Sequence, residues 1–174
     1  MATAHGIVIL QDKPAQFSVT ARVVPDGSGH LYLKGKVADT FPKFFGPVIT
    51  AIRNMEDYLD CVDLDTADIT LRLQTPNNYP LAGGSYALTI GVAILAAATS
   101  KIIPTGNCYT GCLDADGNVQ EVDFIGEKRR GAAGFGFSKF FLPRSQLDMF
   151  STLIAQCPCA TLADAYGITF WNER

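Results

Sequence analysis

The chain has 174 residues, of which 48% are hydrophobic and 18% charged, enough for one domain, residues 1–174, with a well-buried core. The net charge is −3 and no basic run exceeds Lys128-Arg129-Arg130, which argues against nucleic acid or an anionic membrane as a partner. Residues 89–98 are apolar but shorter than the roughly 20 residues that cross a bilayer. No signal peptide is apparent, so we expect a cytoplasmic protein.

The cysteines form an odd set in a core-rich chain, which favours reduced thiols over disulfides. They are Cys61, Cys108, Cys112, Cys157 and Cys159. Their C-x3-C and C-x-C spacings do not match the usual zinc motifs. We therefore expect no metal site and no cofactor.

The first third of the chain alternates apolar and polar residues, which predicts strands at residues 7–10, 17–24 and 31–37. The turn at residues 25–29 is expected to join the last two of these strands as a hairpin. Apolar residues then recur at helical spacing and predict a helix over residues 42–60, in which Pro47 marks an early turn or a kink.

A further strand is predicted at residues 69–73, and a polar loop leads from it to Gly83-Gly84-Ser85. The helix that follows, residues 88–99, is apolar on nearly every face and should be central, ending before Pro104. The remaining elements are a hairpin of residues 108–113 and 119–122, a helix at 125–134, a strand at 139–143, helices at 145–155 and 160–165, and a strand at 168–171. The pattern predicts a single α+β domain with mixed or antiparallel strands around a buried helix.

Ser85 stands where the glycine-rich turn becomes the apolar helix. The first N–H groups of a helix lack intrahelical acceptors, and the helix dipole adds positive charge there. Ser85 can therefore be an ordinary N-cap, or a nucleophile beside a ready-made anion hole. The residues around it leave both readings open.

Several common sites are excluded by motif. The chain has no G-x-x-x-x-G-K-[ST] and no H-E-x-x-H, and its two histidines, His5 and His30, both precede Ser85. A serine nucleophile needs a base, and a buried lysine can serve because burial disfavours its charged form. Lys128 is the candidate, although a solvated lysine in a short basic run is the simpler interpretation.

The segment from Ser85 to Pro143 resembles the proteolytic domain of Lon-type serine proteases, which use a Ser-Lys dyad. The resemblance consists of a serine opening an apolar helix, a Thr-Gly strand end, a glycine-turned hairpin, a lysine heading a short helix, and a strand closing in proline. Here these are Gly84-Ser85, Thr110-Gly111, Gly117-x-Val119, Lys128 and Phe141-Leu142-Pro143. The order of the upstream elements is similar more loosely.

The resemblance implies a fold like that of ribosomal protein S5 domain 2, and a serine endopeptidase. It implies that Ser85 is the nucleophile and Lys128 the general base, that Thr110 holds the lysine amine, and that backbone around Gly83 and Gly84 faces the oxyanion. It also implies peptides or unfolded proteins as substrates and a homo-oligomer, often a hexamer. No ATPase module is attached in this chain, so processive degradation requires a separate ATPase or unfoldase.

The chain also departs from the family pattern. The family usually has Pro before the serine and Ala-Gly after it, where this chain has Gly84, Tyr86 and Ala87. Tyr86 is large and is expected to narrow the substrate cleft, and Cys112 replaces the usual acidic residue after Thr-Gly.

Two other functions remain open. One is a catalytically inactive Lon-like domain that serves as an oligomerisation or binding scaffold, which the departures near Ser85 favour. The other takes residues 80–85 as a phosphate-cradling loop like that of small-molecule kinases with a related α+β fold. Saturable ATP binding would distinguish the latter from a peptidase.

Overall fold

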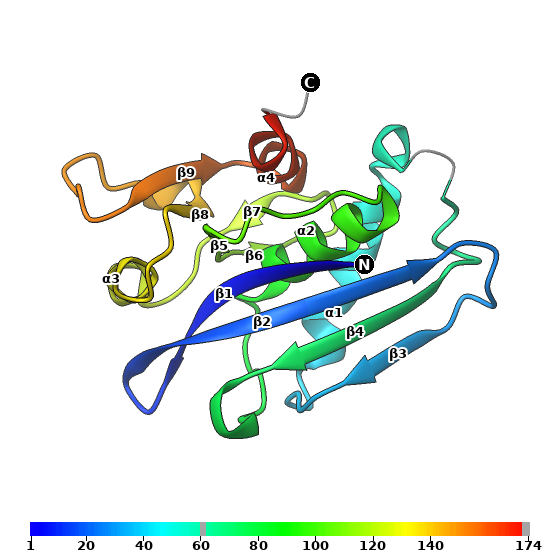
Figure 1. Cartoon of the computed structure of the whole chain (residues 1–174), viewed down its shortest axis with the longest axis horizontal. Coiled ribbons are helices and arrows are strands. Elements are labelled where there is room, and N and C mark those ends of the chain that lie inside the picture. Colours follow the sequence, from blue (N-terminus) through cyan, green and yellow to red (C-terminus); the bar gives the residue numbers. More distant parts are fainter. Residues whose placement is uncertain (60–61, 172–174) are drawn as a thin grey trace.

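A mixed seven-stranded sheet with strand order β3-β4-β2-β1-β5-β8-β9 forms the centre of the protein, and a two-stranded sheet, β6-β7, lies beside it (Figure 1). The computed structural model describes residues 1–59 and 62–171. The strands are β1 Ala2–Leu10, β2 Lys13–Val24, β3 Leu31–Lys34, β4 Asp68–Gln74, β5 Asn107–Tyr109, β6 Cys112–Leu113, β7 Val119–Gln120, β8 Lys139–Pro143 and β9 Ala155–Cys159. The α-helices within these residues are α1 Phe41–Arg53, α2 Ala87–Ala98, α3 Ile125–Gly134 and α4 Leu162–Thr169. Short 3-10 turns occur at Glu56–Tyr58, Pro76–Asn78 and Arg144–Gln146. The single-domain α+β prediction is confirmed.

The first strands pair differently from the prediction. β1 and β2 form an antiparallel hairpin through Gln11 and Asp12, both with positive φ, as a tight hairpin turn requires. β4 lies between β2 and β3, antiparallel to the first and parallel to the second. The expected hairpin between residues 17–24 and 31–37 is therefore wrong. The intervening turn is bound instead to Asp68, whose carboxylate accepts hydrogen bonds from the N–H groups of Ser28 and His30.

The predicted helix at 42–60 is shorter in the structure. α1 ends at Arg53, and residue 60 lies outside the described residues. Pro47 lies inside α1, contrary to the expectation of an early turn or a kink. α1 tolerates the one backbone N–H donor that Pro47 lacks, because packing of its apolar face stabilises it. The buried residues of that face are Phe41, Phe45, Val48, Ala51 and Ile52.

The prediction of a central buried helix is confirmed by α2, in which every residue from Ala87 to Ala97 is buried. It contacts β1 and β2 on one side and α1 and α4 on the other. The helix ends at Ala98, within one residue of the predicted end and well before Pro104. Ser100 adopts a positive φ of 56°, and the Lys101 N–H donates to the Ala96 carbonyl to close the last turn.

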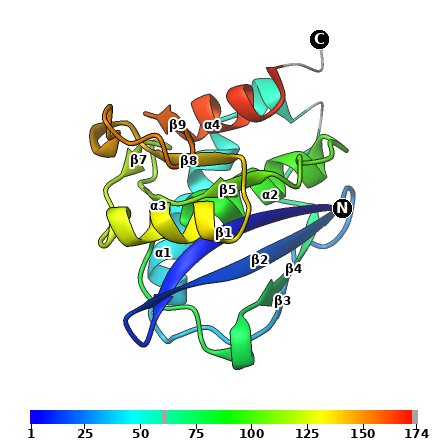
Figure 2. The ribbon, with the colours of Figure 1, turned by 60° about the vertical axis from the view of Figure 1, so that its left-hand side comes forward.

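The second face of the sheet is covered by α3. Tyr109 and Phe141 belong to the large core around α2, whereas their neighbours Cys108 and Phe140 pack with Ala132 of α3 in a separate apolar cluster. Successive strand residues point to opposite faces, so β5 and β8 lie between the two helices. Figure 2 shows α3 in front of β1 with α2 behind it.

The C-terminal prediction is correct for α3, β8 and the β6-β7 hairpin, and partly correct for the helix at 160–165, which α4 overlaps from Leu162. The predicted helix at 145–155 is wrong: a 3-10 turn ends at Gln146, and a loop leads from it to β9, a parallel partner of β8 that the sequence did not indicate. The predicted strand at 168–171 is largely the end of α4, which begins at Leu162 because Thr161 and Asp164 form a capping box. The predicted strand at 108–113 is split between two sheets at Thr110-Gly111.

No helix in the described part of the chain is long and apolar enough to span a membrane.

Candidate active site

The glycine-rich turn brings Ser85 to the start of α2 in close contact with its surroundings. Gly83 has φ +77°, a conformation that favours glycine. A Cβ on Gly84 would lie 2.5 Å from the Phe44 ring and 2.8 Å from Cys112 Sγ. A side chain at Gly84 would therefore push the turn away from α1 and β6.

Ser85 does not cap the helix. The N-cap position belongs to Tyr86, and no hydrogen bond joins the Ser85 hydroxyl to any described residue. The N–H groups of Gly84 and Ser85 likewise donate to no acceptor in this part of the chain. The turn thus offers a free hydroxyl beside two free donors.

The end of β5 is bonded to this turn. The Gly111 N–H donates to the Ser85 carbonyl at 3.0 Å, and the Leu88 N–H donates to the Gly111 carbonyl at 3.0 Å. Thr110, one residue earlier, is fully buried, and its Oγ1 has no hydrogen-bond partner among the described residues. The hydrogen bond between the Thr110 hydroxyl and the Lys128 amine, which the family resemblance implies, is therefore not formed among the described residues.

Lys128 is held in the first turn of α3. The helix begins after Phe124, which has φ +58° and whose carbonyl accepts the Lys128 N–H at 2.9 Å. The Lys128 side chain is 4% exposed, so the interpretation as a solvated lysine is wrong. Burial lowers its pKa to about 8, against the opposing effect of nearby Cys112 and Asp123.

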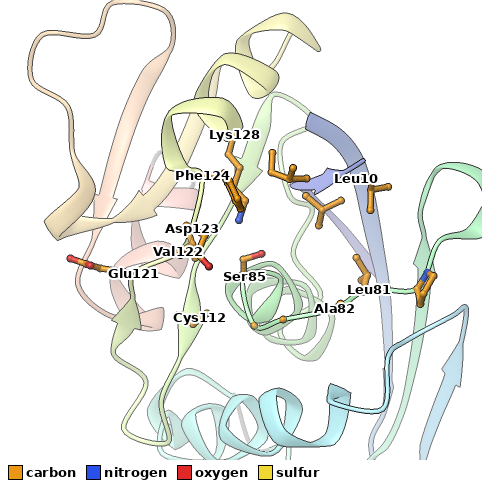
Figure 3. Close-up of a pocket in the computed structure, with 15 residues that line it drawn as sticks. Leu10, Leu81, Ala82, Ser85, Cys112, Glu121, Val122, Asp123, Phe124 and Lys128 are labelled. Carbon is orange, nitrogen blue, oxygen red and sulfur yellow. The ribbon is translucent and has the colours of Figure 1, made fainter. Parts of the chain in front are cut away.

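Ser85 and Lys128 line one cleft of about 270 Å³. Figure 3 shows the Lys128 amine and the Ser85 hydroxyl directed toward one another across it. One wall consists of residues 8–10 and 80–82, and the opposite wall of residues 121–124. Gly83, Gly84 and Cys112 complete the lining.

The edge of β1 borders this cleft. β2 pairs with β1 along its whole length, whereas β5 pairs only as far as Gly6. Val8, Ile9 and Leu10 all line the cleft, although alternate residues of a strand point to opposite faces. Three consecutive lining residues indicate that the strand meets the cleft with its backbone edge, whose hydrogen-bonding groups have no partner strand there.

Hydrogen bonds outside the cleft hold both walls. Leu81 bonds through its backbone to Lys36 and Ala38, with N···O distances of 3.2 and 2.9 Å. On the other wall, the Gln146 side chain accepts from the Val122 N–H at 3.0 Å and donates to the Val122 carbonyl at 2.8 Å. Gln146 lies in the region predicted as a helix, and its role had no sequence signal.

The structure brings Gly83, Gly84, Ser85 and Lys128 together, and excludes Tyr86 from the cleft lining. Tyr86 is fully buried and stacks on Phe41 of α1, so the expectation that it narrows the cleft is wrong. Its hydroxyl has no hydrogen-bond partner in the described part of the chain, and burial raises the pKa of Tyr86 to about 12.

Neither histidine belongs to the cleft. His5 Nδ1 lies 3.2 Å from the Gln16 amide, and His30 lies 3.8 Å from Asp68 at the β2–β3 turn. Within residues 1–59 and 62–171, no group of three or more His, Cys, Asp and Glu side chains could hold a metal. The chemistry available in the cleft is that of Ser85, Lys128, Cys112 and the carboxylates of the 121–124 wall.

Comparison with known proteins relates the chain to Lon proteases. It is 27% identical over 145 residues to Lon protease of Finegoldia magna (strain ATCC 29328 / DSM 20472 / WAL 2508), a match that covers 83% of this chain and 19% of that protein. It is 28% identical over 121 residues to Lon protease of Clostridioides difficile (strain 630), covering 68% and 15% respectively. No family model matches the chain. The chain thus spans less than a fifth of the length of these relatives, and the similarities support a distant Lon-related, protease-like protein.

Proposed function

We propose that this chain is a serine endopeptidase in which Ser85 is the nucleophile and Lys128 the general base. The observation that carries the proposal is the meeting of these two side chains in one cleft, where the lysine is buried and has no ion-pair partner among the described residues. The similarity to two Lon proteases supports a protease-related function.

The proposed reaction follows from the protonation of Lys128. A neutral amine accepts the Ser85 proton while Oγ attacks the peptide carbonyl, forming a tetrahedral intermediate. The lysine then returns that proton to the leaving amine as the C–N bond breaks, leaving an ester on Ser85. Water hydrolyses the ester with the lysine again as base, and the free serine is restored. A pKa of about 8 makes this role accessible near neutral pH.

The free backbone groups suit the rest of the reaction. The unpaired N–H groups of Gly84 and Ser85 are the donors that we assign to the oxyanion, where one donor contributes about 2.7–4 kcal/mol. An extended peptide can add to the free edge of β1 at residues 8–10, since a strand edge offers main-chain hydrogen bonds to such a ligand.

Because an extended segment can pair with the free edge of β1 beside the cleft, we propose peptides or unfolded protein segments as substrates. A folded protein would first have to be unfolded by a separate ATPase or another domain. Assembly into a homo-oligomer and a cytoplasmic location remain predictions from the sequence.

The test is cleavage of casein by the full chain and by two variants, Ser85→Ala and Lys128→Ala. We expect both variants to lose cleavage while keeping the wild-type circular dichroism spectrum. Ser28→Ala and Lys36→Ala change exposed residues outside the cleft and serve as matched controls that keep activity. Full activity in both cleft variants would contradict the proposal.

A second candidate is an inactive Lon-like scaffold, favoured by the unpartnered Thr110 hydroxyl and by Cys112 in the cleft. An active-site phosphonate separates the two functions, because it labels Ser85 only if that serine is nucleophilic. Failure to label while a control protease reacts would favour the scaffold. Saturable ATP binding by calorimetry would instead revive the phosphate-loop hypothesis.

A further inference from the structure

The two walls of the cleft differ in chemistry. Residues 8–10 and 80–82 supply only apolar side chains, whereas the opposite wall carries Glu121 and Asp123. Lys128 is the one basic residue among those that line the cleft. The proposed mechanism requires its amine to be neutral when substrate binds, so the reactive form of the cleft is negatively charged along one wall.

Lys128 itself indicates that this wall faces a ligand site. Its side chain is 4% exposed, forms no hydrogen bond or ion pair with any described residue, and points into the cleft (Figure 3). Asp123 is close enough to raise the pKa of the Lys128 amine, although both Asp123 and Glu121 are themselves exposed. Neither carboxylate has a hydrogen bond or ion pair within the described chain; Asp123 lies beside Ser85 and Lys128, whereas the Glu121 carboxylate points away from them (Figure 3), so Asp123 is the one available to a cation bound in the cleft.

The wall is also held in place. Gln146 bonds to both backbone groups of Val122, between the two acidic residues. Phe124, directly after Asp123, has a φ of +58°, which a bulky residue adopts only where its surroundings impose it. The carboxylates are therefore presented from a fixed backbone rather than from a free loop.

We infer that the cleft selects peptides with a lysine or arginine near the scissile bond, placed against Asp123 on the wall of residues 121–124. The inference rests on the proposed peptidase function and names its substrate class. The long side chain of either residue can lie along the wall while its charge meets the Asp123 carboxylate. An acidic residue at the same peptide position is disfavoured by repulsion, which adds selectivity.

The experiment uses short fluorogenic peptides that are identical except for one position, occupied by Lys, Gln or Glu. This position is moved residue by residue across the scissile bond. At the position that faces Asp123, we expect kcat/KM to be about threefold to fivefold higher for Lys than for Gln at low salt. We expect added salt to reduce the ratio, because salt screens exposed charges.

Asp123→Asn should reduce the Lys-to-Gln ratio, and Asp123→Ser gives a second test of the same carboxylate if the first variant folds poorly. Asp116→Asn is the matched control, because Asp116 is exposed in the β6–β7 turn and does not line the cleft. Loss of its carboxylate should leave the Lys-to-Gln ratio of kcat/KM unchanged. Equal ratios in wild type and in both wall variants would overturn the inference while leaving the peptidase intact. Cleavage of no peptide, together with no phosphonate labelling, would instead overturn the proposed function.

Discussion

Two neighbouring cations on α3 are both buried but have opposite surroundings. Arg129 is 6% exposed, and its guanidinium donates to Asp148 at 3.1 Å and to the Gln146 carbonyl at 3.1 Å. Lys128 is 4% exposed and has neither a hydrogen bond nor an ion pair among the described residues. A buried charge normally has a partner. The contacts of the fold therefore explain why Arg129 is buried, but they do not explain why Lys128 is.

The difference separates a structural cation from a candidate catalytic one. Arg129 ties α3 to the loop after β8, and through Gln146 it supports the wall at Val122. Lys128 faces the cleft with Ser85, and burial lowers the pKa of its amine to about 8, so that the neutral form is accessible near physiological pH. The comparison can be tested by changing each residue to methionine, which keeps an apolar stem of similar length.

The largest expected effect is on activity. Lys128→Met removes the proposed base and should lower kcat/KM for casein-derived peptides by about 10²–10⁴-fold. Arg129→Met leaves the cleft lining in place, so its activity per folded molecule should fall much less. Equal losses in the two variants would remove the distinction between the cations.

The next effect is on stability, and we expect the two substitutions to change the free energy of unfolding in opposite directions. Arg129→Met should lower the free energy of unfolding by about 1–3 kcal/mol, because Asp148 and the Gln146 carbonyl lose their donor. Lys128→Met should raise it at pH 7 by as much as about 3 kcal/mol, because a buried amine with a lowered pKa is costly to keep. Urea denaturation of both variants measures this, and destabilisation by Lys128→Met would contradict it.

The same lysine predicts a pH dependence of stability. Between pH 8 and 10.5 the unfolded chain binds the Lys128 proton more tightly than the folded chain, so this residue makes stability rise with pH over that window. The buried thiol of Cys159 and phenol of Tyr86, whose pKa values are raised, act in the opposite direction at higher pH. The difference between wild type and Lys128→Met isolates the lysine contribution.

A substitution at Thr110 tests the catalytic role proposed for Lys128. The buried Thr110 hydroxyl has no hydrogen-bond partner within residues 1–59 and 62–171, and we expect it to bond the Lys128 amine during the reaction. Thr110→Val should then reduce kcat about tenfold or more without loss of stability, because it removes an unsatisfied polar atom. Unchanged kcat would show that the hydroxyl has no role in the reaction.

The smallest expected effect is on the pH profile. Wild-type kcat/KM should rise with pH through about 8, as Lys128 loses its proton. Cys112 and Asp123 both face the amine and raise its pKa. Removing the carboxylate in Asp123→Asn should therefore move this limb to lower pH by a fraction of a unit, whereas Asp116→Asn should not.

Local sequence patterns were sufficient where packing agreed with them. The apolar run of α2 predicted its burial, and the extents of α3 and β8 were predicted correctly. The C-terminal errors have a common cause: residues 145–155 have helical apolar spacing, but Asp148 and Gln156 hold the segment as a loop by side-chain to backbone hydrogen bonds. Such bonds between distant residues leave no periodic signal.

By itself, the sequence determined the α+β class and the buried helix, and it named Ser85 and Lys128 as candidates through a resemblance to Lon-type proteases. Only the tertiary structure decided that Lys128 is buried without a partner while Arg129 is paired, and that the edge of β1 and an acidic wall enclose the cleft. Burial and the pairing of a charge depend on which distant residues pack together. For these two adjacent cations, that packing is set by β1, β6 and the loop after β8 rather than by their own neighbours in the chain.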